Sequence, residues 1–154
     1  MSEPIPADRV ALLRDLVARL QRGTLSRLTR IPIDALYWQA HRETNSIGVT
    51  MWHYTRWFDL LGTVTLVGGE TESQHWFRDG WMERTGYDPR GIGSGGLGLI
   101  TGYTVDEMLA VPRLPASELA EYLRASMASA LVALRAVSSA LALGPVRAAD
   151  RHPA

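Results

Sequence analysis

His53 is the side chain whose type and position are best suited to bind a metal ion. It lies in a segment where Ile47, Met51, Tyr54 and Phe58 recur at spacings of three and four residues, as on one face of a helix. At about 100° per residue, His53 lies about 120° from the centre of this stripe, beside the apolar seam. Its two ring nitrogens both need partners. A divalent metal backed by an acceptor would satisfy them, and so would a carbonyl and water around a structural histidine, so both interpretations are open.

Few other side chains are placed to complete a metal site. His41 and His75 fall in predicted loops or short turns, and their spacing does not show that they converge with His53. Asp79 and Glu83 are four residues apart on a possible short helix and could meet at a metal, but neighbouring arginines make solvated acids the simpler interpretation. The chain has no cysteine, which excludes thiolate ligands and cysteine nucleophiles.

Two further classes of function have little support. The basic and acidic residues balance at 16 each, which gives no basic surface for nucleic acid. The glycine-rich run at 93–98 suggests a phosphate-binding loop, but no strand precedes it and the chain has no lysine. We interpret this run as a surface loop.

The elements that must position these residues are helices. Apolar periodicity predicts long helices over 8–30, from Asn45 or Ser46 to about 61, and over 116–141. Thr104 and Glu107 form a capping-box pattern at the start of a short helix. Residues 67–103 form a glycine-rich insert with short helices. Five tryptophans favour core packing, and Trp52, about 140° from the seam, is expected to contact another element or subunit.

Several short motifs occur in an order typical of one bacterial family. They are Leu36-Tyr-Trp-Gln39, Asn45-Ser-Ile-Gly48, Trp52-His-Tyr54, the segment Trp76 to Arg84, and Gly102-Tyr-Thr-Val-Asp-Glu107. Together they resemble the DinB-like superfamily over residues 8–140, and the last two are similar to the insert of an actinobacterial-type branch.

The resemblance implies an up-down-down-up four-helix bundle that is often dimeric. Its active branches include metal-dependent transferases and isomerases that use mycothiol or bacillithiol, and they hold the metal with one histidine on the second helix and two on the last. His53 matches the first of these. This sequence has no His-x3-His pair, and its remaining histidine, His152, lies near the C-terminal end. We therefore expect the fourth helix of the family to be missing.

These observations predict an all-α, DinB-like helical bundle over residues 1–142, with three long helices, and a disordered or frayed tail over 143–154. Three helices leave an apolar groove that self-association would cover. We expect a cytoplasmic homodimer without nucleic-acid or membrane partners, of unassigned specific activity and non-catalytic or degenerate. The alternative is a thiol transferase or isomerase that uses Zn, Ni, Mn or Fe, with His53 as a ligand and a small-molecule thiol as partner. The sequence identifies no catalytic residue.

Overall fold

The computed structural model describes residues 7–142, a range built from helices and loops without a β-strand. The elements in chain order are α1 (Ala7–Leu28), α2 (Ile33–Leu36), α3 (Ile47–Leu60), the π-helix η1 (Leu61–Thr65), η2 (Thr71–Ser73), α4 (His75–Arg78), α5 (Trp81–Thr85), η3 (Ser94–Gly96), α6 (Val105–Leu109) and α7 (Ala116–Ala142). The all-α prediction is confirmed. The predicted tail, 143–154, lies outside the described residues. Within 7–142 no helix has the length and apolar character needed to cross a membrane.

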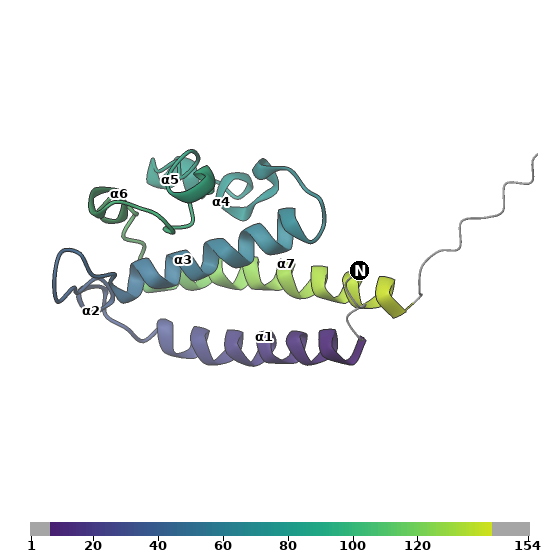
Figure 1. Ribbon diagram of the computed structural model, residues 1–154. Coiled ribbons are helices and arrows are strands. Elements are labelled where there is room, and N and C mark those ends of the chain that lie inside the picture. Colours follow the sequence, from purple (N-terminus) through teal and green to yellow (C-terminus); the bar gives the residue numbers. More distant parts are fainter. Residues whose placement is uncertain (1–6, 143–154) are drawn as a thin grey trace, which may run out of the picture.

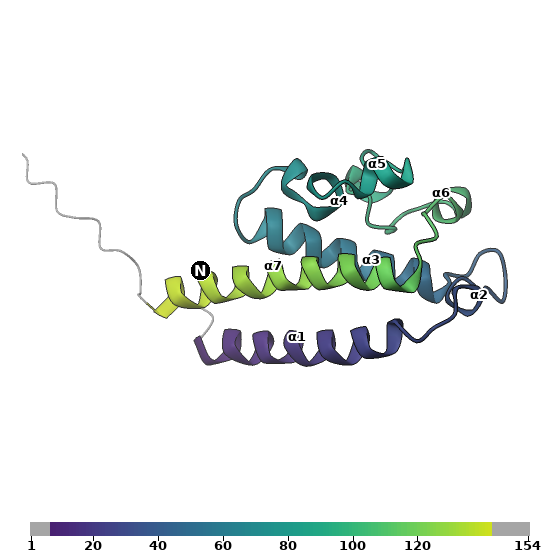
Figure 2. The same ribbon diagram turned by 180° about the vertical axis from the view of Figure 1, so that it is seen from behind.

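Helix α7 is the central element of the bundle. Helix α1 packs along it on one side and α3 on another, while α1 and α3 make far less contact with each other. Figure 1 shows the three long helices side by side, with the short helices α4, α5 and α6 over the side of α3 that faces away from α1. The reverse view in Figure 2 gives the same order. The insert therefore has the α3–α7 pair as its support.

Two helix starts follow the predicted capping chemistry. The Ser46 hydroxyl accepts the Val49 N–H at 3.2 Å at the start of α3. The Thr104 hydroxyl accepts the Glu107 N–H at 3.2 Å, and the Glu107 carboxylate accepts the Thr104 N–H at 2.7 Å. These bonds satisfy amides that have no partner in the first helical turn.

The face of α3 that is most deeply buried differs from the predicted seam. Met51, Tyr54 and Phe58 are only partly buried against the core, whereas Arg56 and Asp59 are fully buried. The polar face is buried because Tyr122 of α7 and two amides of α4 donate to Asp59, and Arg56 reaches the Gly98 carbonyl oxygen of the insert.

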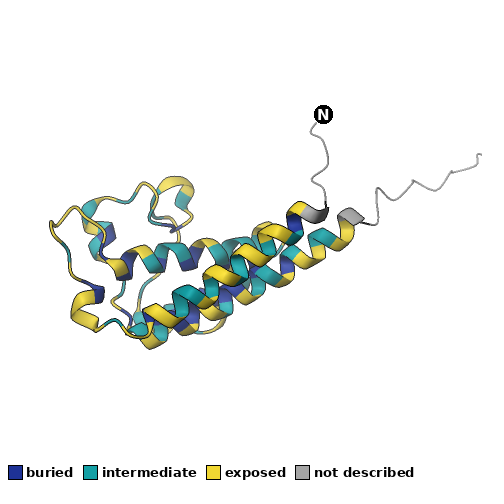
Figure 3. Ribbon diagram, turned by 90° about the horizontal axis from the view of Figure 1, so that it is seen from below, coloured by how far each residue is buried: buried dark blue, intermediate teal, exposed yellow. Residues whose placement is uncertain are grey.

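Helix α1 also has two different faces. Val10 and Leu28 are buried, but Leu13, Leu16 and Leu20 are 51%, 46% and 54% exposed. Figure 3 shows exposed positions running along this helix. The apolar residues of α1 therefore do not form one buried stripe, and among the described residues the main helical partner of α1 is α7.

The insert packs on the bundle through aromatic rings. The ring centroids of Trp52 and Trp76 are 5.5 Å apart, and those of Trp76 and Tyr122 are 5.3 Å apart. The expectation that Trp52 contacts another element is confirmed. The possible short helix that would carry both Asp79 and Glu83 is two short helices, α4 and α5, because Gly80 adopts a left-handed φ of 77° between them. This break separates Asp79 from Glu83.

Gly62, in η1, lies directly against the backbone of α7. A Cβ built on it would clash with the Ala130 backbone, with the Ala130 Cα only 2.8 Å away. The atoms that would clash belong to the backbone of α7, so no side-chain rotation can relieve the clash. Gly23 on α1 is a natural contrast, since a Cβ there would meet nothing within 4 Å.

We predict opposite effects of the same substitution at these two glycines. Gly62→Ala should lower the free energy of unfolding by about 1–3 kcal/mol, the usual cost of overpacking. Gly23→Ala should raise it by about 0.5–1 kcal/mol, because alanine loses less backbone entropy in a helix. Urea unfolding followed by circular dichroism measures both. Equal effects at the two positions would contradict the proposed close contact.

Candidate functional site

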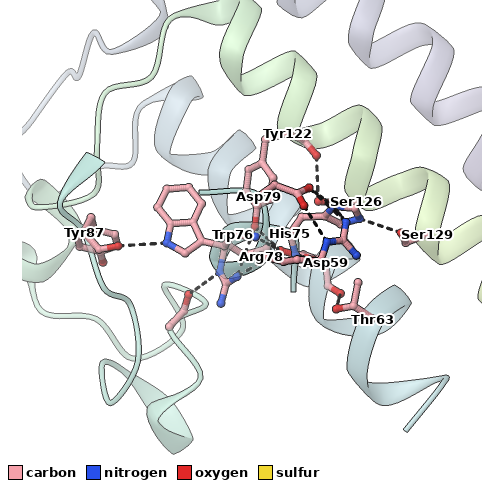
Figure 4. A network of polar contacts seen from close by, with 12 residues as sticks. Asp59, Thr63, His75, Trp76, Arg78, Asp79, Tyr87, Tyr122, Ser126 and Ser129 are labelled. Carbon is pink, nitrogen blue, oxygen red and sulfur yellow. Dashed lines mark hydrogen bonds and ion pairs between the residues drawn. The ribbon is translucent and has the colours of Figure 1, made fainter. Parts of the chain in front are cut away.

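A cluster of polar side chains, buried at its centre, lies where α3, α4 and α7 meet, shown in Figure 4. We call it the polar cluster; its members are Arg56, Asp59, His75, Asp79, Tyr122 and Ser129. They come from three elements that are far apart in the sequence. The cluster is therefore the place where the insert is attached to the bundle.

Asp59 is the centre of the polar cluster. Its carboxylate is 0% exposed and accepts the backbone N–H groups of His75 at 2.8 Å and Trp76 at 3.0 Å. It also accepts the Tyr122 hydroxyl at 2.8 Å. The two amides belong to the first turn of α4, where no carbonyl of that helix can reach them. Asp59 thus fixes where α4 begins and joins it to α7.

Arg56 supplies the positive charge that accompanies Asp59. Its Nη1 lies 3.5 Å from the Asp59 carboxylate and 3.4 Å from the Tyr122 oxygen, and its Nε lies 3.5 Å from the Gly98 carbonyl oxygen. The guanidinium is 1% exposed, so the pair avoids leaving a lone charge in the interior. All three bonds are long, and a guanidinium has five N–H donors. Arg56 therefore keeps donor capacity for a further acceptor.

Tyr122 is a hydroxyl donor at neutral pH. Burial raises its pKa well above the usual value, and the neighbouring Arg56 charge only partly opposes this effect. The neutral phenol can donate its proton to Asp59 while accepting from Arg56. It thereby bridges both members of the ion pair without adding charge.

Asp79, His75 and Ser129 form a chain of hydrogen bonds. His75 Nδ1 lies 2.6 Å from an Asp79 oxygen and its Nε2 lies 2.8 Å from the Ser129 hydroxyl. Desolvation is the largest influence on the pKa of Asp79 and raises it, but hydrogen bonds from Arg78 and His75 and their charges together hold this pKa below its usual value. The Arg78 guanidinium lies 2.7 Å from the same Nδ1, so this nitrogen contacts both a carboxylate and a cationic donor.

This order of acid, imidazole and hydroxyl is the one used by serine hydrolases. The nucleophile of those enzymes also needs free N–H donors for the oxyanion. Ser129 lies inside α7, where backbone N–H groups are engaged in the helix. We interpret the hydrogen bonds that link Asp79, His75 and Ser129 as a structural connection between α4 and α7, which we call the clasp.

His53 lies apart from the polar cluster. It is half-buried, and its ring packs at 6.4 Å from that of Trp57. Its Nδ1 is buried and has no hydrogen-bond partner among the described residues. Within residues 7–142 no three histidine, aspartate or glutamate side chains come together in a way that could hold a metal. The described residues alone therefore do not fit the three-ligand site that the family resemblance implies.

The other candidate residues are dispersed. His41 is exposed in a turn with Thr44, and Glu83 is exposed on α5. His75 and Asp79 do meet, but in the clasp with Ser129. Sequence analysis missed Arg56 and Asp59 as a pair; the available signal was their spacing of three residues on the same face of α3 as Trp52.

We predict that the polar cluster is essential for stability. Asp59→Ala should lower the free energy of unfolding by about 3–5 kcal/mol, because it leaves Arg56 buried without its counter-ion. Tyr122→Phe keeps the ring and the Arg56–Asp59 pair and removes only the two hydrogen bonds of the hydroxyl, to Asp59 and from Arg56, so its cost should be smaller, about 1.5–3 kcal/mol. Chemical denaturation of both variants gives the comparison. An Asp59→Ala variant as stable as the unmodified protein would show that the polar cluster does not stabilise the fold.

Comparisons with known proteins bear on the family. No curated protein and no solved structure matches the chain. The family model described as the DinB superfamily matches residues 16–153, which is most of the sequence. The chain therefore belongs to the DinB superfamily.

Proposed function

We propose that the protein is a non-catalytic, cytoplasmic member of its superfamily that acts as a homodimeric binding protein. The observation that carries this proposal is the row of leucines exposed on α1. We call it the leucine stripe; its members are Leu12, Leu13, Leu16 and Leu20, each close to half exposed or more.

The spacing of the leucine stripe suits a helical partner. Leu13, Leu16 and Leu20 follow each other at three and four residues, so they lie on one face of α1. Contiguous exposed apolar side chains are uncommon on soluble monomers and usually mark a contact surface. A two-fold symmetric dimer would place the same stripe of each copy against the other.

Helix α3 carries further apolar side chains beside the C-terminal end of α1. Ile47 is exposed on it, and Met51 is partly buried. Between them and the end of α1 lies a pocket of about 190 Å³ that Leu28 and Ile31 also line. Covering the stripe and this pocket together would bury the side of the bundle that α7 does not reach.

We predict that introducing negative charges into the leucine stripe prevents dimerisation. The unmodified protein should sediment as a dimer at micromolar concentration. The double variant Leu16→Glu, Leu20→Glu should sediment as a folded monomer, because two buried carboxylates per subunit would have no partner. Val67→Glu, at an exposed apolar position after η1, is the matched control and should remain dimeric. A well-folded monomer of the unmodified protein would overturn the proposal.

The second candidate is a divalent-metal-dependent transferase or isomerase acting on a small-molecule thiol of the mycothiol or bacillithiol type. The buried, unpartnered Nδ1 of His53 favours it. A metal bound there would lower the pKa of a thiol and make it a nucleophile. His53 would be one ligand, and the others would have to come from outside the described residues or from a second subunit.

Metal content tests the second candidate directly. Under it, purified protein should hold close to one Zn, Ni, Mn or Fe per chain, and His53→Ala should lose it. His41→Ala removes an exposed histidine and should keep the metal. Elemental analysis of the three proteins gives the result. Equal metal content in His53→Ala and the unmodified protein would contradict a role for His53.

A further inference from the structure

A second pocket, of about 380 Å³, lies on the insert side of α3. We call it the insert pocket; α3 contributes Arg56 and Leu60, the η2–α4 segment contributes Gln74 and Phe77, and the glycine-rich loop contributes Arg90 and Leu97. Its volume is within the range of small-molecule sites. It does not include any member of the leucine stripe or His53.

Gln74 lines this pocket and has a side-chain acceptor without a hydrogen-bond donor among the described residues. The residue is 3% exposed, and its side-chain Oε1 is buried without a hydrogen-bond partner among the described residues. Its backbone is fixed at the start of α4, where its carbonyl oxygen accepts the Arg78 N–H at 2.9 Å. A buried acceptor without a donor is costly, and a donor on a bound ligand would remove that cost.

Two guanidinium groups line the insert pocket, and both are already paired with carboxylates: Arg56 with the buried Asp59, and Arg90 with Asp88 at 2.7 Å and with Glu72. The three hydrogen bonds of the Arg56 guanidinium are all 3.4 Å or longer. Arg56 lies 5.5 Å from the centre of the Phe77 ring, and Arg90 lies 4.9 Å from the same ring. A carboxylate is the group that a guanidinium binds best, through paired N–H donors.

The remaining lining residues supply apolar contact and one exposed negative charge. Leu60, Phe77 and Leu97 present apolar side chains to the pocket. Glu72 lines it as well and pairs with Arg90 at 3.3 Å. The insert pocket thus combines guanidinium donors for an anion, an acceptor for a donor, and an apolar wall.

We infer that the insert pocket binds a free α-amino acid with an apolar side chain. The ligand carboxylate would lie on Arg56, the ammonium group would donate to Gln74 Oε1 with Glu72 nearby, and the side chain would pack on Phe77 and the two leucines. This inference goes beyond the proposed self-association and is independent of it, because the residues do not overlap.

Thermal unfolding in the presence of each standard α-amino acid tests the inference. At least one with an apolar side chain should raise the melting temperature, since a ligand that binds only the folded state stabilises it. For that amino acid, calorimetric titration should show at least tenfold weaker binding of the analogue without the amino group and of the analogue without the carboxylate. No shift with any of them at about 10 mM would overturn the inference, because that excludes even millimolar affinity.

Gln74→Leu separates a binding role from a structural one. The leucine removes a polar atom that has no partner, so the variant should be at least as stable as the unmodified protein. It should nevertheless bind the amino acid at least tenfold more weakly, and bind the analogue without the amino group as well as before. Gln21→Leu on α1, outside the insert pocket, is the matched control and should bind normally. Unchanged amino-acid binding by Gln74→Leu would overturn the assignment. Both outcomes can be read whether the protein is a monomer or a dimer.

Discussion

The arrangement of the molecule depends on one buried carboxylate. Asp59 has no contact with water, and its oxygens accept from two amides of α4 and from the Tyr122 hydroxyl, with Arg56 beside them. A charge in the interior is tolerated only when such partners surround it. Because these partners come from α3, α4 and α7, the carboxylate is satisfied only when the three elements are assembled. The same interaction therefore specifies both the helix pair and the position of the insert.

The Arg56–Asp59 pair also determines how the insert packs on α3. Arg56 reaches the Gly98 carbonyl oxygen, so the ion pair also holds the glycine-rich loop against α3. The Trp76 amide itself donates to Asp59, and the Trp76 ring packs on Trp52 and Tyr122. Gly98 has no room for a side chain, since a Cβ there would be 2.5 Å from the Pro89 side chain. The insert pocket is the space left between this tightly placed loop and α3.

Local patterns in the sequence were sufficient to predict the long helices. The apolar periods and the capping groups at Ser46 and Thr104 are interactions within a few residues, and they gave α3, α6 and α7 nearly correct bounds. Burial of the polar face of α3 could not be predicted in this way. Arg56 and Asp59 resemble solvated charges until Tyr122, 63 residues beyond Asp59, is known to lie beside them. The family match supports the resemblance that the motifs suggested, but it does not test His53 as a ligand.

Two kinds of groups lack partners among the described residues: exposed apolar side chains and buried polar atoms. They lie on different parts of the bundle. On α1 the unsatisfied surface is apolar, because α7 covers only one face of that helix. On α3 and at the start of α4 it is polar, because His53 Nδ1 and Gln74 Oε1 are withdrawn from water without a partner. Apolar surface gains from any complementary apolar cover, whereas an isolated acceptor gains only from a donor placed within hydrogen-bond distance. A second protein copy suits the first surface, and a small molecule or ion suits the second. The proposed assembly and the proposed ligand binding therefore depend on different surfaces of this fold.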